Sequence, residues 1–278
     1  MTAGTPRRRS AAWTIARTDL RQLLESRDFW LPLAVVALLF FVVLPALLLY
    51  AVSSVEDAEL VGNLGNVIGA LPESVRRNVR GDTPEVEASY ALAVYLFAPL
   101  AVIVPLTVSS AIGAHTIVGE RERGSGEFLA HSPASERDIY VGKLVAGLVP
   151  GYLTAAVGFG LYSVVVNVIV GPGLGGWFFP TSNWWVLMGW VVPPFIALAL
   201  ALILAVSAKV SSAAAAQQAS ALVSLPLILV AYGVASGTLF QAQAAAVAIG
   251  GVAWLGAAIA LWRGARVVTR ERLLGLGG

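Results

Sequence analysis

The sequence contains six long apolar runs that hold no Asp, Glu, Lys or Arg. They cover residues 30–52, 89–117, 144–169, 184–207, 212–234 and 243–262. About 20 apolar residues are enough to cross a hydrocarbon core of about 30 Å, and each run reaches that length. Inside such a core a single segment satisfies its backbone hydrogen bonds only as a helix. The runs therefore predict an all-α integral membrane protein with six transmembrane helices in a single domain, residues 1–278.

The composition supports the same fold class. Hydrophobic residues make up 58% of the chain and charged residues only 12%, whereas roughly a quarter of a soluble domain is charged. The net charge of +2 gives no reason to expect nucleic acid as a partner, and membrane lipids are the expected surroundings. The chain has no cysteine, which excludes disulfides and thiolate metal sites. We predict no metal site.

The distribution of Lys and Arg predicts the orientation. If the N-terminus lies in the cytoplasm, fifteen of the eighteen basic residues lie on the cytoplasmic side, as the positive-inside rule requires. The other three are Arg76, Arg77 and Arg80, all in the segment 53–88. We therefore expect both termini in the cytoplasm, a large external loop at 53–88 that forms short helices, and a multi-pass protein of the cell (cytoplasmic) membrane.

Residues 10–28, before the first run, are predicted to form an amphipathic helix in the inner membrane interface. Its apolar stripe and its polar residues fall on different helical faces. The stripe comprises Trp13, Ala16, Leu20, Leu23 and Leu24, and the residues off it are Arg17, Arg21 and Glu25. We single out Trp13, Arg17, Leu20 and Arg21 as the residues of this interfacial helix. A helix that is simply solvated is the alternative.

Aromatic residues gather at 176–185, where Trp177, Phe178, Phe179, Trp184 and Trp185 predict an aromatic belt at the outer boundary. Polar residues in the runs, such as Asn167, are expected to hydrogen-bond between helices.

The runs contain no charged residue, which disfavours an ion-coupled secondary transporter, because such proteins keep ionisable groups inside the bilayer. No motif of the form GxxxxGK[ST] occurs, so the chain cannot itself hold ATP in a P-loop. Ser236 and His115 fall near opposite faces of the membrane, and Ser125 and His131 share a loop that offers no third orienting group. We therefore predict no catalytic residue. The chain is not expected to be an enzyme.

Charge, glycine and proline are concentrated between the second and third runs, in "VGERERGSGEFLAHSPASERDIYVGK" at 118–143. An apolar pair, Phe128 and Leu129, is surrounded by charges, and this combination suits docking into a groove on a cytosolic partner. A solvated linker is the alternative. Ser135 and Asp138 have the spacing of a helix start leading into the third run.

This segment resembles the loop of ABC-2-type permeases, the membrane subunits of ATP-binding-cassette transporters. The family pattern reads approximately E-x-E-x-G-T-x-E-x-L, then L or A, then x-x-P, with G-K about ten residues later. The matching positions are Glu120, Glu122, Gly124, Glu127, Leu129, Pro133, Gly142 and Lys143. Ser125 stands where threonine is usual, and Gly126 where a larger residue is usual. The order of interfacial helix, long outer loop and six spans is also similar to that family.

The resemblance implies a permease that pairs with a second permease copy or homologue and with two separate ABC ATPase subunits, which carry the ATP and Mg. The coupling loop, 119–138, would contact the ATPase, as would the interfacial helix. The coupling residues are Glu120, Arg121, Glu122, Arg123, Gly124, Glu127, Phe128, Leu129 and Pro133. By analogy with the family, transport is expected to be export.

The family's translocation path runs between the two permeases. For this chain the resemblance points to a path or dimer face with Ala213, Ala216, Gln217 and Ser220, for which close helix packing is the alternative. A membrane scaffold or anchor that binds a cytosolic partner without transport also stays open. The sequence does not indicate the substrate.

Overall fold

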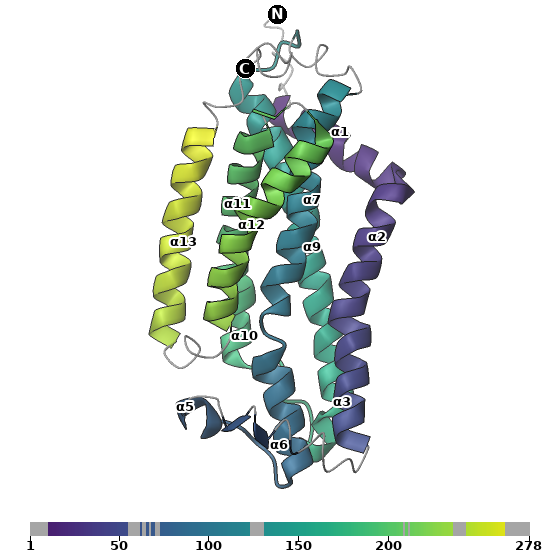
Figure 1. Cartoon of the computed structure of the whole chain (residues 1–278), viewed down its shortest axis with the longest axis vertical. Coiled ribbons are helices and arrows are strands. Elements are labelled where there is room, and N and C mark those ends of the chain that lie inside the picture. Colours follow the sequence, from purple (N-terminus) through teal and green to yellow (C-terminus); the bar gives the residue numbers. More distant parts are fainter. Residues whose placement is uncertain are drawn as a thin grey trace, which may run out of the picture.

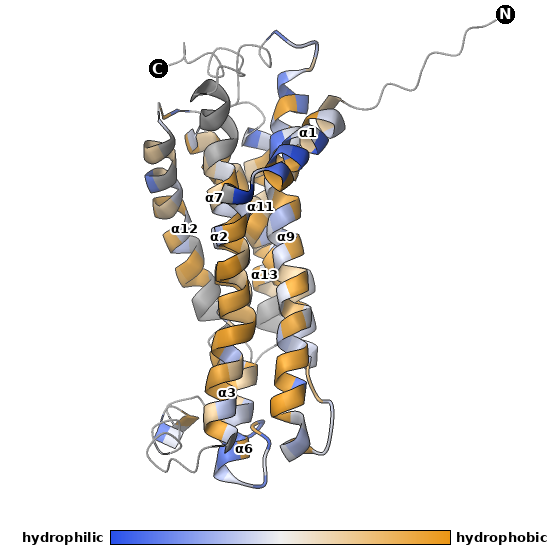
Figure 2. Ribbon diagram, turned by 90° about the vertical axis from the view of Figure 1, so that its right-hand side faces the viewer, coloured by the Kyte–Doolittle hydropathy of each residue, from blue (hydrophilic) through white to orange (hydrophobic). Residues whose placement is uncertain are grey.

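The computed structural model describes residues 11–54, 73–122, 131–207, 212–235 and 243–264, together with the separate positions 62, 65, 66, 68, 69, 209 and 210. Within these residues every regular element is helical. The long helices lie side by side along the longest axis, and their middle parts are strongly hydrophobic (Figures 1 and 2). The all-α fold class is therefore confirmed for the described part of the chain.

The chain begins with helix α1 and continues with long helices and several short helical segments. The first are α1 (Ala11–Glu25), α2 (Arg27–Leu38), the π-helical η1 (Leu39–Val43), α3 (Leu44–Ser54), α5 (Glu73–Arg76), α6 (Pro84–Ala91), the π-helical η2 (Leu92–Leu96) and α7 (Leu100–Glu122). The second half comprises α9 (Glu136–Ile169), the 3-10 helix η3 (Gly171–Leu174), α10 (Ser182–Val186), the π-helical η4 (Leu187–Val191), α11 (Val192–Ser207), α12 (Ala213–Ala235) and α13 (Gln243–Gly264).

Five helical stretches of the described residues are long and apolar enough to cross a membrane. They are Trp30–Ser53, Pro84–Ala114, Glu136–Ile169, Ser182–Ser207 and Val247–Gly264. The predicted run 212–234 corresponds to α12, whose apolar stretch, Ala214–Val230, is shorter than the other five. The five membrane-length stretches each correspond to one of the remaining predicted runs.

The centre of the bundle is built from α7, α9 and α11. Leu200 on α11 is fully buried and packs on two glycines of the neighbouring helices. A Cβ atom at Gly113 on α7 would lie 2.9 Å from Leu200 Cδ2, and one at Gly147 on α9 would lie 2.8 Å from it. Small residues let helix backbones approach closely where water is absent and dispersion contacts dominate. The glycines therefore set the distances between the three central helices.

The second predicted span is interrupted between η2 and α7. The amide of Phe97 bonds to Leu92 O, the amide of Ala98 bonds to Tyr95 O, and Pro99 has no N–H, so the carbonyls of Ala93 and Val94 lack their usual backbone donors. Side chains from other helices replace these donors. Tyr162 Oη donates to Ala93 O at 2.6 Å, and Trp184 Nε1 donates to Val94 O at 3.0 Å. The open carbonyls at this break are thus satisfied in the core.

The aromatic segment 176–185 divides into buried and exposed side chains. Trp177 and Trp185 are 73% and 61% exposed, as an aromatic belt predicts, but Phe179 and Trp184 are buried. Trp184 stacks on Tyr162 with ring centroids 5.3 Å apart. The belt prediction was therefore wrong for these two residues, because the chain folds back after η3 and inserts them between helices.

Asn167 holds this returning segment in place. Its Nδ2 donates to Phe179 O at 2.6 Å, and its Oδ1 accepts from the amides of Phe178 and Phe179 at 2.9 and 3.0 Å. The expected hydrogen bond between two helices is thus replaced by a clamp from α9 to the backbone of the following loop.

The structure also adjusts three predicted boundaries. The helix expected at 10–28 ends at Glu25, and α2 begins at Arg27. The loop expected at 53–88 ends earlier, because Thr83 caps α6 by accepting from the Val86 amide at 3.5 Å, and it contains the short helix α5. The predicted coupling loop, 119–138, begins inside α7 and ends inside α9.

Candidate functional site

The predicted coupling residues divide between the end of α7 and the segment that follows it. Glu120, Arg121 and Glu122 form the last turn of α7, so this helix continues beyond the end of the apolar run at 117. Pro133 lies in the turn that precedes α9. The remaining predicted residues lie outside the described residues, namely Arg123, Gly124, Glu127, Phe128 and Leu129.

A capping box fixes the point at which the chain re-enters a helix. The Asp138 amide donates to Ser135 Oγ at 3.1 Å, and the Ser135 amide donates to Asp138 Oδ2 at 3.3 Å. Each satisfied N–H at a helix start typically contributes about 1 kcal/mol. The helix start predicted from Ser135 and Asp138 is confirmed, and α9 continues from it for 34 residues.

Helix α1 packs across the first turns of α9 at this same end of the bundle (Figure 1). Gly142 makes the close approach possible, because a Cβ there would lie 2.9 Å from Ala12 O and 2.8 Å from Ile15 Cβ. Ala16, one turn further along α1, is only 1% exposed. The Gly-Lys pair that matched the permease pattern therefore lies in a helix crossing.

Lys143, the second residue of that pair, makes a buried ion pair with α1. Its Nζ lies 2.9 Å from Asp19 Oδ2, and the two side chains are 2% and 14% exposed. Sequence reasoning did not pair these residues. The available signal was the position of Asp19, three residues after Ala16 and four before Leu23, on the face that carries apolar residues. An acid on that face requires a partner when the face is covered.

The opposite face of α1 is open. Of the four residues predicted for the interfacial helix, Trp13, Arg17 and Arg21 are exposed and Leu20 is half-buried. Arg21 Nε donates to Glu25 Oε1 at 2.8 Å, an exposed pair of the kind that contributes little to stability. The helix thus has one face packed on α9 and one face carrying cations.

The predicted path or dimer face lies on α12. Ala216 is buried against Ala114 of α7, and Ser220 is 1% exposed, with its hydroxyl donating to Ala216 O at 2.7 Å. These two side chains are packed within the chain, and their part in a path or dimer face stays a prediction. Ala213 and Gln217 lie on the same helix, and their side chains are outside the described part of the structure.

One turn beyond Ser220, the hydroxyls of Ser224 on α12 and Ser110 on α7 lie 2.8 Å apart.

Among the described residues, no group of three His, Asp or Glu side chains could hold a metal ion.

Comparison with known proteins bears on this arrangement. The chain matches the model of a family described as ABC-2 family transporter protein over residues 13–255, which takes in α1, the α7–α9 junction and most of α13. A comparison with curated protein sequences gives no match. The match and the membrane-length helices together show a multi-pass membrane protein of the permease type. The chain belongs to the ABC-2 family of transporter proteins.

Proposed function

We propose that this chain is the permease subunit of an ABC transporter of the cell (cytoplasmic) membrane. With a second permease copy or homologue it forms an ATP-driven translocation path, and it exports its cargo. Two separate ATPase subunits bind and hydrolyse ATP with Mg, and this chain contributes no catalytic residue and no cofactor. The observation that carries the proposal is the match to the ABC-2 family over residues 13–255, and the packing of α1 on the start of α9 with its buried ion pair supports it.

The proposed topology has six spans within a single transmembrane domain, residues 1–278. Helix α12 is the additional span. Support comes from the arrangement of the ends: α1, the end of α7, the start of α9 and the end of α13 all lie at one end of the bundle (Figure 1). Among the residues that the structure describes, most Lys and Arg belong to segments at this end, whereas Arg76, Arg77 and Arg80 lie in the segment between α3 and α6. The positive-inside rule places the first end and both termini in the cytoplasm.

In the proposed mechanism, the ATPase grips the coupling loop, with Phe128 and Leu129 in a groove and the charges around them fixing the register. Closure of the ATPase dimer then displaces Pro133 and the start of α9. The capping box at Ser135 makes that start a firm helix end, so the displacement passes into α9 without fraying. Because Lys143 and Asp19 join α9 to α1, the interfacial helix moves with it.

The test is a combined change at the loop, Glu122→Lys with Phe128→Ala, in the chain co-expressed with an ATPase subunit encoded beside it. We expect loss of co-purification of the ATPase, because both the apolar anchor and one charge are changed. The matched control is Asp82→Lys, a charge reversal at an exposed residue of the segment between α3 and α6, which should leave the complex intact. Full recovery of ATPase with the loop variant would refute the proposed docking.

A further inference from the structure

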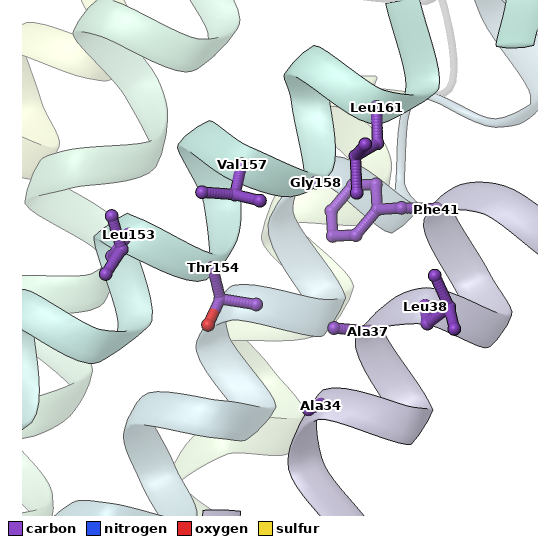
Figure 3. A pocket seen from close by; sticks show the side chains of 9 residues that line it. All are labelled: Ala34, Ala37, Leu38, Phe41, Leu153, Thr154, Val157, Gly158 and Leu161. Carbon is purple, nitrogen blue, oxygen red and sulfur yellow. The ribbon is translucent and has the colours of Figure 1, made fainter. Parts of the chain in front are cut away.

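A groove runs along the side of the bundle between α2 and α9. Figure 3 shows one part of it, a cavity of about 280 Å³ that ends where Phe41 packs on Gly158. An adjoining cavity of about 390 Å³ reaches α7 and α1. Both are lined by Ala34, Leu153 and Thr154, so the two cavities adjoin each other. The larger cavity alone falls in the size range of small-molecule sites, about 300–1,000 Å³.

The groove lies beside the place where Phe41 of η1 packs on α9. Gly158 has no side chain, which allows the Phe41 ring to lie directly on the α9 backbone. Toward α1 the residues facing α9 are Ala34 and Ala37, and these are too small to close the remaining distance. The lateral opening is shown by Leu153 and Val157, which are 59% and 53% exposed.

The lining selects a hydrocarbon occupant. All the residues around both cavities are apolar except Thr154, and its hydroxyl already donates to Pro150 O at 2.8 Å. A polar ligand entering the groove would lose its hydrogen bonds and find few replacements, which costs free energy. An acyl chain that already lies in hydrocarbon loses no hydrogen bonds, and the groove can hold it through dispersion contacts.

Two arginines lie close in sequence to the end of the groove where α1 meets α2. This end is lined by Leu20, Leu24 and Trp30, and Trp30 Nε1 donates to Leu24 O at 3.2 Å. Arg17 precedes Leu20 by three residues and Arg27 precedes Trp30 by three, so each arginine lies within one helical turn of a lining residue. Both arginines are exposed. An apolar groove with arginines within one turn of its end is complementary to an acyl chain joined to a phosphate.

We propose that this groove binds one acyl chain of an anionic glycerophospholipid from the leaflet that faces α1, with the phosphate held near Arg17 and Arg27. The bound lipid fills the space between α2 and α9. The inference goes beyond the proposed function: it uses the membrane placement of α1, but it requires neither the ATPase nor the cargo.

The test uses the full chain, delipidated in detergent and titrated with 1-palmitoyl-2-oleoyl phosphatidylglycerol or the matching phosphatidylcholine, with binding read by native mass spectrometry. Ala34→Trp fills the space shared by both cavities at an exposed position. It should weaken phosphatidylglycerol binding about tenfold or more, because excluding even two methylene groups has that effect. The matched control, Ala156→Trp, changes an exposed residue of α9 outside the groove and should bind as the unchanged chain does.

The headgroup assignment has its own variants. Arg17→Gln with Arg27→Gln should abolish the preference for phosphatidylglycerol over phosphatidylcholine, while Arg76→Gln, at an exposed arginine of the segment between α3 and α6, should preserve it. Equal binding by Ala34→Trp and Ala156→Trp would overturn the site. An unchanged lipid preference in the double arginine variant would overturn the choice of an anionic lipid.

A second copy of this chain is the competing occupant. Because the chain has no cysteine, Leu153→Cys and Val157→Cys report directly on it. Disulfide-linked dimers formed in membranes through these positions would show that a neighbouring chain covers the groove, and would overturn lipid binding there. Failure of ATPase co-purification would leave the lipid result unaffected, so the two proposals fail separately.

Discussion

Lys143 on α9 and Asp19 on α1 form an ion pair of 2.9 Å with almost no access to solvent. The pair joins α9, the helix that follows the predicted coupling loop, to α1, the helix that begins the described chain. Gly142 lies beside it and lets the two backbones meet. Together the ion pair and the close crossing pack α1 onto the first turns of α9.

Removing one partner of this pair should destabilise the protein strongly. Lys143→Met leaves the Asp19 carboxylate largely buried without its cation, and breaking a buried pair in this way costs about 3–5 kcal/mol. Because Asp19 retains some exposure, we expect the lower end of that range. Reversible unfolding of the full chain by SDS in mixed micelles, followed by tryptophan fluorescence, measures the change.

The double variant Asp19→Leu/Lys143→Met is the control, since replacing a whole buried pair by apolar residues is often close to neutral. The reversed pair, Asp19→Lys/Lys143→Asp, should recover part of the lost stability. Strictly additive effects of the two single changes would contradict the pairing.

Substitution of Gly142 should separate α1 from α9. Gly142→Ala places a methyl group against Ile15 and the fixed carbonyl of Ala12, and overpacking of this kind costs about 1–3 kcal/mol. Gly160→Ala is the matched control on the same helix, because nothing lies within 4 Å of its Cβ position; there alanine should be neutral or stabilising by up to about 1 kcal/mol. Thermal unfolding in detergent compares the two variants, and equal midpoints would argue against the close crossing.

The interrupted second span predicts a specific role for the Tyr162 hydroxyl. Tyr162→Phe keeps the ring but leaves Ala93 O without its donor at the break before Pro99, and an unsatisfied buried carbonyl costs about 1–3 kcal/mol. Tyr50→Phe, at a residue that is 62% exposed, should have no measurable effect. SDS unfolding of both variants provides the comparison. Identical stability of the two would mean that another group, such as an ordered water, satisfies Ala93 O.

The sequence alone determined the features that depend on neighbouring residues. Runs without charge identified the long helices, because a charge in the hydrocarbon core is costly wherever the rest of the chain lies. The three-residue spacing of Ser135 and Asp138 identified the start of α9. Each of these rules acts within one or two helical turns.

Tertiary structure decided which of these features meet. In the sequence Lys143 only precedes the third apolar run, whereas in the structure α1 lies across it and supplies its ion-pair partner. Trp184 was predicted to be a belt residue, whereas in the structure it is buried against Tyr162. Asn167 likewise forms hydrogen bonds with the backbone of a loop and not with another helix. These outcomes depend on packing between segments far apart in the sequence, where a single glycine, such as Gly142, sets how closely two helices approach, and no local pattern contains that information.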